Sequence, residues 1–220
     1  MLIEPSFERD DLAKLFGSTR SRSLSRSVVL KLKKLRPTFE QLMMPRLHYK
    51  TKMVSSINKK EVTIEGGHTF RSSKLSKAMK DCESLICFIA TIGSGVDKEI
   101  ARLTGENRLS LAYLLDSLGS VAVENVAEGF HQSMKAQSEA IAQGVTYRFS
   151  PGYCDWPITE QKGFFKLFDS EKTGVRLLDS CLMWPRKSIS GVFGIYNDTE
   201  KVPYNPCRDC LKKNCKARRI

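Results

Sequence analysis

A continuous apolar run at residues 84–93, SLICFIATIG, is the feature of this sequence that most constrains its fold. An apolar run of this length is typical of a buried strand. The longest helical period follows at residues 108–141, where Gly119, Ala122 and Ala127 are small enough for close packing. Strands and helices interleave along the chain without a regular βαβ rhythm. The fold class is therefore predicted to be α+β, with a mixed or antiparallel sheet flanked by helices.

Local patterns predict the other elements. Alternating, partly β-branched stretches at residues 48–57 and 61–66 indicate two strands joined by a short turn. Helical spacing predicts a helix from Val28 to Met44 that ends before Pro45. The remaining expectations are helices at 7–17, 72–82 (capped by Ser72 or Ser73), 96–103 and 158–169 (with Thr159 as a candidate cap), and two strand-like pieces around Pro185–Lys187.

The positive charge of the chain is concentrated at its two ends. The formal net charge is +12, and residues 1–60 hold 14 Lys and Arg against 5 Asp and Glu. Residues 201–220 hold 7 against 1, whereas the residues between these ends hold 15 against 18. We therefore divide the chain into a basic N-terminal helical and strand extension (1–60), a core (61–200) and a basic cysteine-containing tail (201–220). Basic ends suit an acidic partner, either a nucleic acid or an acidic protein surface, although a solvated helix face would also explain them.

Several protein classes find no support in the sequence. No apolar run approaches the roughly 20 residues of a membrane span, and the first residues, MLIEPSFERDD, lack the charged-then-apolar order of a signal peptide. A cytoplasmic location without membrane contact is expected. The histidines His48, His68 and His131 share no metal-binding spacing. The GSG at 93–95 is better explained as a tight strand-to-helix turn than as a phosphate loop, so classical hydrolase chemistry is not supported.

Seven cysteines without a signal peptide argue against a disulfide scaffold, because the cytosol keeps thiols reduced. Cys207, Cys210 and Cys215 follow a C-x2-C-x4-C spacing that can wrap one tetrahedral metal. A zinc ion or an iron–sulfur cluster is thus predicted in the tail, with reactive or merely reduced thiols as the alternative. A tetrahedral site needs a fourth ligand, from the body of the protein (Cys154 or Cys181), from water or from substrate. Otherwise the cysteines of the body are interpreted as small buried residues: Cys82, Cys87, Cys154 and Cys181.

The segment 148–157, RFSPGYCDWP, places a cation and an aromatic ring close together on an irregular backbone. Pro151 and Gly152 let the backbone turn tightly and approach a ligand closely. Arg148 can bind a carboxylate through two parallel hydrogen bonds. Such a contact is worth roughly 1.5–3 kcal/mol when partly desolvated. Tyr153 can stack on a ring or donate its hydroxyl. The set suits a ligand that joins an amino acid to an aromatic portion, and the alternative is a rigid structural loop with a surface arginine.

Several motifs in a fixed order resemble the activation domain of cobalamin-dependent methionine synthase. That family has an arginine followed by Pro-Gly-Tyr and a proline, then a Met-Trp-Pro segment, and then a Ser-Gly before an aromatic strand. The resemblance covers about residues 115–195 and includes AEGF at 127–130. At 155–156 the sequence has Asp-Trp where the family has a small residue and a cysteine. In this sequence the motifs are Arg148, Pro151–Tyr153, Pro157, Met183–Pro185 and Ser190–Gly191.

The resemblance implies an activation-domain-like core that binds S-adenosylmethionine. It assigns Arg148 to the carboxylate of this ligand, Glu128 to its amino group, and Gly152 and Tyr153 to its adenosyl portion. The remaining ligand-binding positions that it implies lie before the aromatic strand: Ser190 and Gly191.

The resemblance further implies a stand-alone accessory protein for the reductive reactivation of a corrinoid, as part of a cobalamin-dependent methionine synthase or related methyltransferase system. The expected partners are a corrinoid protein or methyltransferase subunit, which would carry the cobalamin, and a flavodoxin- or ferredoxin-like electron donor attracted by the basic ends. The chain would position the methyl group in line with cobalt. The alternative is a non-enzymatic nucleic-acid-binding module with basic ends and a metal-held cysteine tail, and salt-dependent binding to DNA or RNA would favour it.

Overall fold

The computed structural model describes residues 25–200 and 202–210. Its centre is a six-stranded sheet in the order β3-β2-β1-β4-β8-β5, and each neighbouring pair of strands is antiparallel. The α+β prediction is confirmed, whereas the predicted helix at 7–17 lies outside the described residues. The strands are β1 (Arg46–Ile57), β2 (Glu61–Ile64), β3 (Thr69–Arg71), β4 (Ser84–Thr91), β5 (Gly144–Val145) and β8 (Ser188–Tyr196).

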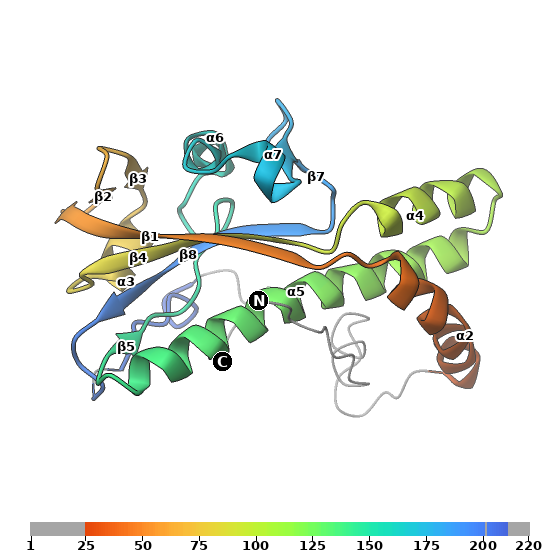
Figure 1. Ribbon diagram of the computed structural model, residues 1–220, viewed down its shortest axis with the longest axis horizontal. Helices are drawn as coiled ribbons and strands as arrows, with labels where there is room; N and C mark the ends of the chain where they lie inside the picture. The colour runs from red at the N-terminus through yellow and green to blue at the C-terminus, as the bar shows by residue number, and fades with distance from the viewer. Residues whose placement is uncertain (1–24, 201, 211–220) are drawn as a thin grey trace.

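Helices cover both faces of this sheet. Figure 1 shows the sheet nearly edge-on, with α5 running along one face and α6 and α7 on the other. A small second sheet pairs β6 (Arg176–Leu177) with β7 (Met183–Trp184). The helices are α2 (Arg26–Leu42), α3 (Ser73–Met79), α4 (Gly95–Gly105), α5 (Leu109–Glu139), the 3-10 turn η1 (Ile158–Glu160), α6 (Gln161–Phe165) and α7 (Ser170–Thr173).

The predicted buried strand is β4, and all of its residues are buried. Side chains alternate between the two faces of a strand. Ile86 and Phe88 therefore pack in a core shared with α5, whereas Leu85 and Cys87 pack in a second core shared with α3 and α6. Because both faces are covered, β4 needs an apolar residue at almost every position, which explains its continuous apolar run.

Phe130 fixes α5 against the sheet. Its ring centroid lies 5.7 Å from those of Phe88 in β4 and Phe193 in β8, and 5.1 Å from that of Tyr49 in β1. Aromatic pairs at these separations add about 0.5–1.5 kcal/mol each beyond their buried area. One helical residue thus contacts three neighbouring strands, and it lies two positions after Glu128.

The strand β1 occupies the middle of the sheet, between β2 and β4. It pairs with β4 from Arg46 opposite Thr91 to Met53 opposite Ser84. Residues 46–57 were assigned above to an N-terminal extension, and the structure includes them in the central sheet.

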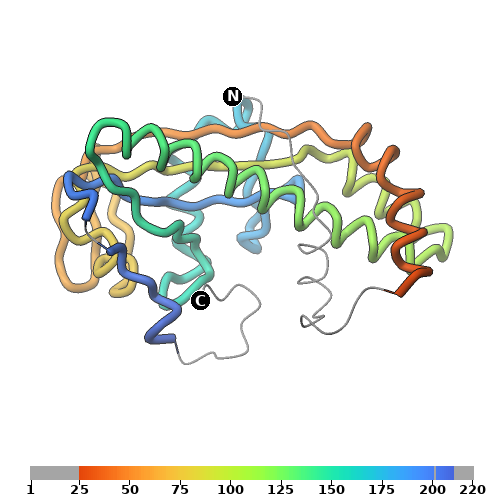
Figure 2. Tube along the Cα trace, turned by 90° about the horizontal axis from the view of Figure 1, so that it is seen from below, coloured from red at the N-terminus to blue at the C-terminus, as the bar shows by residue number. Residues whose placement is uncertain are grey.

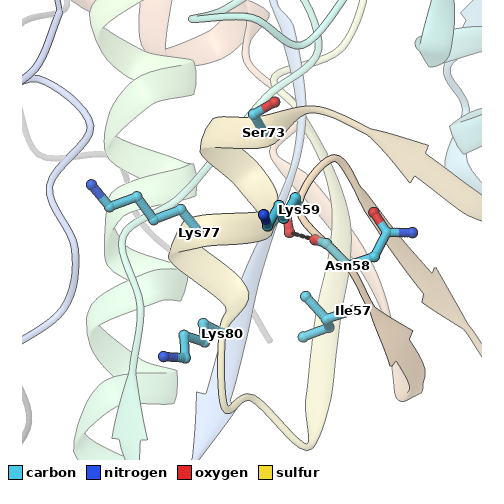
Figure 3. Close-up of a pocket in the computed structure, with 7 residues that line it drawn as sticks. Ile57, Asn58, Lys59, Ser73, Lys77 and Lys80 are labelled. Carbon is cyan, nitrogen blue, oxygen red and sulfur yellow. Dashed lines mark hydrogen bonds between the residues drawn. The ribbon is translucent and has the colours of Figure 1, made fainter.

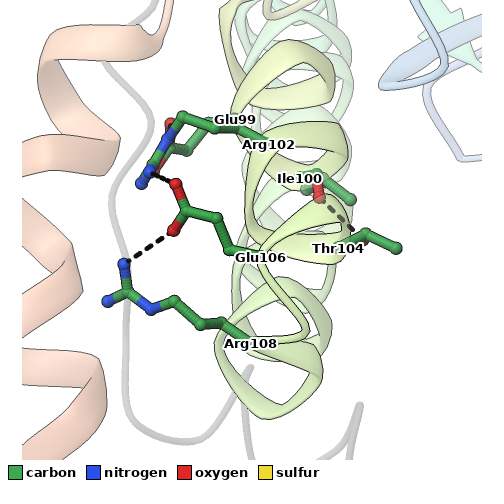
Figure 4. A network of polar contacts seen from close by, with 6 residues as sticks. All are labelled: Glu99, Ile100, Arg102, Thr104, Glu106 and Arg108. Atoms are coloured by element: carbon green, nitrogen blue, oxygen red, sulfur yellow. Dashed lines mark hydrogen bonds and ion pairs between the residues drawn. The ribbon is translucent and has the colours of Figure 1, made fainter.

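The turn from α4 to α5 is held by a network of ion pairs (Figure 4). Arg102 lies 2.7 Å from Glu99 and also pairs with Glu106, and Glu106 lies 3.3 Å from Arg108. Exposed pairs of this kind are individually weak. Together they join residues on both sides of the turn.

The predicted cap of α3 by Ser72 or Ser73 is confirmed, because Ser72 accepts a hydrogen bond from the Leu75 backbone N–H at 3.0 Å. Other local expectations need correction. Thr159 lies inside η1 and does not cap it. The short strands β3 and β5 were not predicted. Within the described residues, no helix is long and apolar enough to cross a membrane.

Candidate functional site

A cleft of about 500 Å³ opens between the C-terminal half of α5 and the chain that follows this helix. This volume falls within the range of about 300–1,000 Å³ that is usual for small-molecule sites. One wall is α5, and the other is formed by residues 144–148 together with Tyr196, Thr199 and Pro203. Two of the six predicted ligand-binding residues, Glu128 and Arg148, line this cleft.

Arg148 and Glu128 form an ion pair at the cleft wall. The Nη2 atom of Arg148 lies 2.9 Å from Glu128 Oε2 and 3.5 Å from Glu124 Oε2. The Arg148 side chain is only 10% exposed, whereas the two glutamate side chains are 48% and 58% exposed. A mostly buried cation thus faces two half-exposed carboxylates.

The environment of Glu128 favours its charged form. Desolvation raises the pKa of Glu128, but a hydrogen bond from Gln132 at 2.7 Å and the charge of Arg148 outweigh it, so the pKa lies below its ordinary value. The carboxylate is therefore ionised at neutral pH. Its negative charge can balance the positive charge of Arg148 or of an ammonium group on a ligand.

Hydrogen bonds on both sides of Arg148 hold its segment to β8 and to α5. The following residue, Phe149, exchanges two backbone hydrogen bonds of 2.8 Å with Val192 of β8. On the other side of Arg148, the carbonyl of Thr146 accepts a hydrogen bond of 2.8 Å from Nε2 of His131 in α5. His131 thus has a structural role here. The two fixed neighbours limit where the guanidinium can move.

Ser190 and Gly191 lie in β8 beneath this segment and are not among the described residues that line the cleft. Ser190 is 3% exposed. A Cβ atom at Gly191 would lie 2.7 Å from the carbonyl oxygen of Phe149 and 3.0 Å from Ser150 Oγ. The close approach of the Arg148 segment explains the glycine. Direct contact of these two residues with a ligand stays a prediction.

The Pro-Gly-Tyr turn follows Arg148. Gly152 has a φ of +90°, a conformation that favours glycine. Its N–H donates to the carbonyl of Trp156 at 2.8 Å, and the N–H of Tyr153 donates to the carbonyl of Ser150 at 3.2 Å. Both N–H groups are therefore used within the turn. The Tyr153 side chain is exposed, as are its neighbours Gly152 and Cys154.

The Asp-Trp pair at 155–156 anchors this turn. The Asp155 carboxylate accepts hydrogen bonds from the Ser72 hydroxyl and from the backbone N–H of Ser73, the latter at 2.8 Å, at the start of α3. Trp156 is 1% exposed and packs edge-on against Phe70 at a centroid distance of 5.4 Å. The departure from the family pattern thus joins the turn to α3 and to the second core.

Glu124 and Gln132, which the sequence motifs did not indicate, both contact the Arg148–Glu128 pair. Each lies four residues from Glu128 on α5, and residues at this spacing share one face of a helix. The pattern E-x3-E-x3-Q at 124–132 was the sequence signal available for them.

The described cysteines divide into buried and accessible residues. Cys82, Cys87 and Cys181 are buried as predicted, and burial raises the pKa of the Cys87 thiol to about 12. Cys154 is exposed, so its prediction as a buried residue was wrong. In the tail Cys207 and Cys210 are half-buried, and Cys215 lies outside the described residues. In the part of the chain that the structure describes, no three His, Cys, Asp or Glu residues form a group that could hold a metal ion.

A second cleft, of about 580 Å³, lies between the β1–β2 turn and α3 (Figure 3). Lys59, Lys77 and Lys80 line it, and the Ser76 hydroxyl donates to the carbonyl of Asn58 at its side. None of the predicted site residues lines this cleft. Its cations favour an anionic group or an acidic protein surface.

The long helix over an antiparallel sheet defines a fold that is also seen in a solved structure. The chain is similar to the structure titled "Crystal Structure of the MetH Reactivation Domain bound to AdoHcy", with a TM-score of 0.57 and 18% sequence identity over 88% of this chain and 68% of that chain. At this identity the likeness shows a shared fold. A comparison with curated proteins gives no match.

The family is shown by the sequence itself. Residues 73–215 match the model for the activation domain of vitamin B12 dependent methionine synthase. The chain belongs to this family, which confirms the resemblance noted in the sequence. The matched range includes the cleft residues Glu128 and Arg148 and extends into the cysteine tail.

Proposed function

We propose that the cleft beside Arg148 binds S-adenosylmethionine, and that the chain serves the reductive reactivation of a corrinoid held by a partner protein. Family membership supports this function, as does the shared fold with a domain that is titled as bound to AdoHcy. The observation that carries the proposal is the contact between Arg148 and Glu128, 2.9 Å apart at the wall of a cleft of suitable size.

This ion pair is complementary to the amino-acid end of the ligand. An α-amino acid carries a carboxylate and an ammonium group on one carbon atom. A guanidinium and a carboxylate that lie side by side offer the opposite charge to each of them. Ligand entry would replace the internal ion pair by two new pairs, so that neither protein charge is left uncompensated when water leaves the cleft.

The turn after Arg148 is proposed to contact the adenosyl portion. The exposed ring of Tyr153 can stack on the adenine base. Gly152 would act through the shape of the turn, because its N–H is already bonded to Trp156. Asp155 and Trp156 would keep this turn at a fixed position relative to the cleft.

The ligand would supply a methyl group that is transferred from the sulfonium to the reduced corrinoid of the partner. Reduction of the oxidised corrinoid is unfavourable, and irreversible methyl transfer drains the small reduced population. The residues of this chain would bind the amino-acid end and hold the sulfonium toward the docked partner. A flavodoxin- or ferredoxin-like protein is proposed as electron donor, and the basic cleft of Lys59, Lys77 and Lys80 offers an acidic donor the opposite charge.

Isothermal titration calorimetry with S-adenosylmethionine and S-adenosylhomocysteine tests the ligand site. The wild type should bind both ligands. Arg148→Ala should weaken binding roughly 10- to 150-fold, because a charge-assisted contact is worth about 1.5–3 kcal/mol. Arg108→Ala is a matched control, since Arg108 is half-exposed in the network at the start of α5. Equal affinities for Arg148→Ala and wild type would remove Arg148 from the site.

Reactivation is tested separately. The purified chain, with S-adenosylmethionine and a reductant, should restore methyl transfer by an oxidised corrinoid protein, and Arg148→Ala should not. Salt-dependent binding to DNA or RNA by a chain with no affinity for S-adenosylmethionine would instead favour the nucleic-acid-binding alternative.

A further inference from the structure

Arg148 has two acidic neighbours that lie about one turn apart on α5. Its Nη2 atom is 2.9 Å from Glu128 Oε2 and 3.5 Å from Glu124 Oε2. Residues four apart share one face of a helix and are separated by about 6 Å along its axis. The Arg148 side chain is mostly buried, whereas that of Glu124 is 58% exposed. The ion pair used by the proposed function therefore leaves a second carboxylate beside the same cation.

The charges around the cleft do not cancel. Within the described part of the chain, the Lys, Arg, Asp and Glu residues that line it are Glu128, Lys135, Glu139 and Arg148. Lys135 lies 3.7 Å from Glu139, so the charges of these two residues balance each other. Arg148 and Glu128 balance each other in the same way, and Glu124 then adds one more negative charge next to Arg148. The site thus has one carboxylate more than it has cations.

The chain that returns after α5 passes the helix in the direction of Glu124. The carbonyl of Thr146 accepts a hydrogen bond from His131, and two residues later Arg148 contacts Glu128 and Glu124, which lie earlier in α5. Figure 2 shows this return beside the helix, where the colour changes from green to teal. The Pro-Gly-Tyr turn comes next in the chain. A ligand that extends from the ion pair to this turn therefore extends from Glu128 toward the Glu124 side.

The substrate and the product of the proposed methyl transfer differ in the charge on sulfur. S-adenosylmethionine has a positively charged sulfonium between its amino-acid end and its adenosyl portion. When the methyl group is transferred, the electron pair of the S–C bond stays on sulfur, which becomes the neutral thioether of S-adenosylhomocysteine. The amino-acid end is the same in both molecules and would occupy Arg148 and Glu128 in both. The sulfonium alone offers a positive charge to Glu124.

We propose that Glu124 determines the preference of the cleft for S-adenosylmethionine over S-adenosylhomocysteine by attracting the sulfonium. The charges of the site cancel when the sulfonium is bound, whereas the thioether leaves one carboxylate without a balancing cation. Because Glu124 is half-exposed and water weakens the attraction, the preference should be roughly 3- to 10-fold. The product then leaves the cleft more readily than the substrate. This inference rests on the proposed function, since it requires that both ligands bind in this cleft.

Isothermal titration calorimetry with both ligands on the full chain tests the role of Glu124. The wild type should bind S-adenosylmethionine roughly 3- to 10-fold more tightly than S-adenosylhomocysteine. Glu124→Gln keeps the size of the side chain and removes its charge, so the two affinities should become equal, mainly through weaker binding of the sulfonium. Glu124→Asp keeps the charge and should keep most of the preference.

Glu40→Gln is the matched control. Glu40 is also half-exposed and paired with an arginine, at 2.7 Å from Arg36, but it lies in α2 and is not among the described residues that line the cleft. This variant should show the preference of the wild type. An undiminished preference in Glu124→Gln, or equal affinities in the wild type, overturns the role of Glu124 alone. Failure of the wild type to bind either ligand overturns the proposed function, and this inference with it.

A salt series on the wild-type chain tests the charge origin of the preference without a variant. The Debye length falls from about 30 Å at 0.01 M salt to about 3 Å at 1 M salt. The preference for S-adenosylmethionine should therefore shrink toward equal affinities as salt is added, because the extra attraction acts through solvent at a half-exposed carboxylate. A change in the fold would affect both ligands alike. A ratio of the two affinities that does not change with salt contradicts selection by charge.

Discussion

The guanidinium of Arg148 lies 2.9 Å from the carboxylate of Glu128, a residue 20 positions earlier in the chain. The contact exists because the chain leaves α5, turns at β5 and returns along β8, where Phe149 pairs with Val192. Glu124 lies 3.5 Å from the same guanidinium nitrogen. Two carboxylates thus balance the charge of one mostly buried cation. Glu128 can therefore pair with a ligand while Glu124 stays beside Arg148.

Replacement of Glu128 should reveal this compensation through the pH dependence of stability. The pKa of Glu128 in the folded protein is lower than its ordinary value. A lowered pKa gives stability that is fully present above the ordinary value and is lost as the pH falls through the folded-state value. The wild type should therefore be more stable than Glu128→Gln at pH 7, and the difference should shrink as the pH falls to about 3.

Urea unfolding at a series of pH values measures this difference. Glu139→Gln is a matched control, because Glu139 lines the same cleft but its ion pair with Lys135 is longer, at 3.7 Å, and more exposed. The control should show a smaller effect at neutral pH. A stability difference between wild type and Glu128→Gln that stays constant from pH 7 to the acid end would contradict the ion-pair explanation.

The sequence predicted the parts of the fold that carry long, unambiguous patterns. An uninterrupted apolar run predicted the buried strand β4, and a sustained helical period predicted the long helix α5. The strands β3 and β5 span three and two residues, too few for any period to be visible. Their pairing is set by neighbouring strands and not by their own residues.

Two residues of the candidate cleft, Arg148 and Glu128, were nominated by the sequence, but their contact and the neighbours Glu124 and Gln132 were not. Motif order nominated Arg148 and Glu128 separately, whereas their contact depends on how the chain returns after α5. For Cys154, the predicted burial itself was wrong. It was interpreted as a small buried residue, yet the φ of +57° at this residue turns the chain so that Trp156 enters the core while Cys154 stays exposed.

Gly144→Ala should destabilise the junction between α5 and β5. A Cβ atom at this position would lie 2.3 Å from the ring of Tyr196, which is 3% exposed and has little room to move. Overpacking of this kind costs about 1–3 kcal/mol. Gly105→Ala at the end of α4 is the control, since a Cβ atom there meets nothing within 4 Å, and the helix preference of alanine should make it neutral or stabilising by up to about 1 kcal/mol. Urea unfolding that ranks the two variants equally would refute the packing argument.

Asp155→Ala should both weaken α3 and loosen the Pro-Gly-Tyr turn. The carboxylate accepts hydrogen bonds from the backbone at the start of α3, and loss of a helix cap costs about 0.5–2 kcal/mol. Because Asp155 lies within the turn, its removal should also speed hydrogen exchange at the N–H groups of Gly152 and Tyr153. Asp169→Ala removes a cap of α7 that is local to its own helix, so it should leave exchange in the turn unchanged. Unchanged exchange in Asp155→Ala as well would show that Trp156 alone holds the turn.

Recognition of the amino-acid end can be isolated by comparing two ligands on two proteins. 5′-Methylthioadenosine shares the adenosyl portion of S-adenosylhomocysteine but lacks the amino-acid end. If Arg148 and Glu128 bind that end, the wild type should prefer S-adenosylhomocysteine by at least roughly 10-fold, because one charge-assisted bond contributes about 1.5–3 kcal/mol. In Arg148→Ala the preference should largely disappear, because only the adenosyl contacts remain for both ligands. Calorimetry on the four combinations gives the coupling directly, since changes in the fold affect both ligands alike. An undiminished preference in Arg148→Ala would place the amino-acid end of the ligand elsewhere in the cleft.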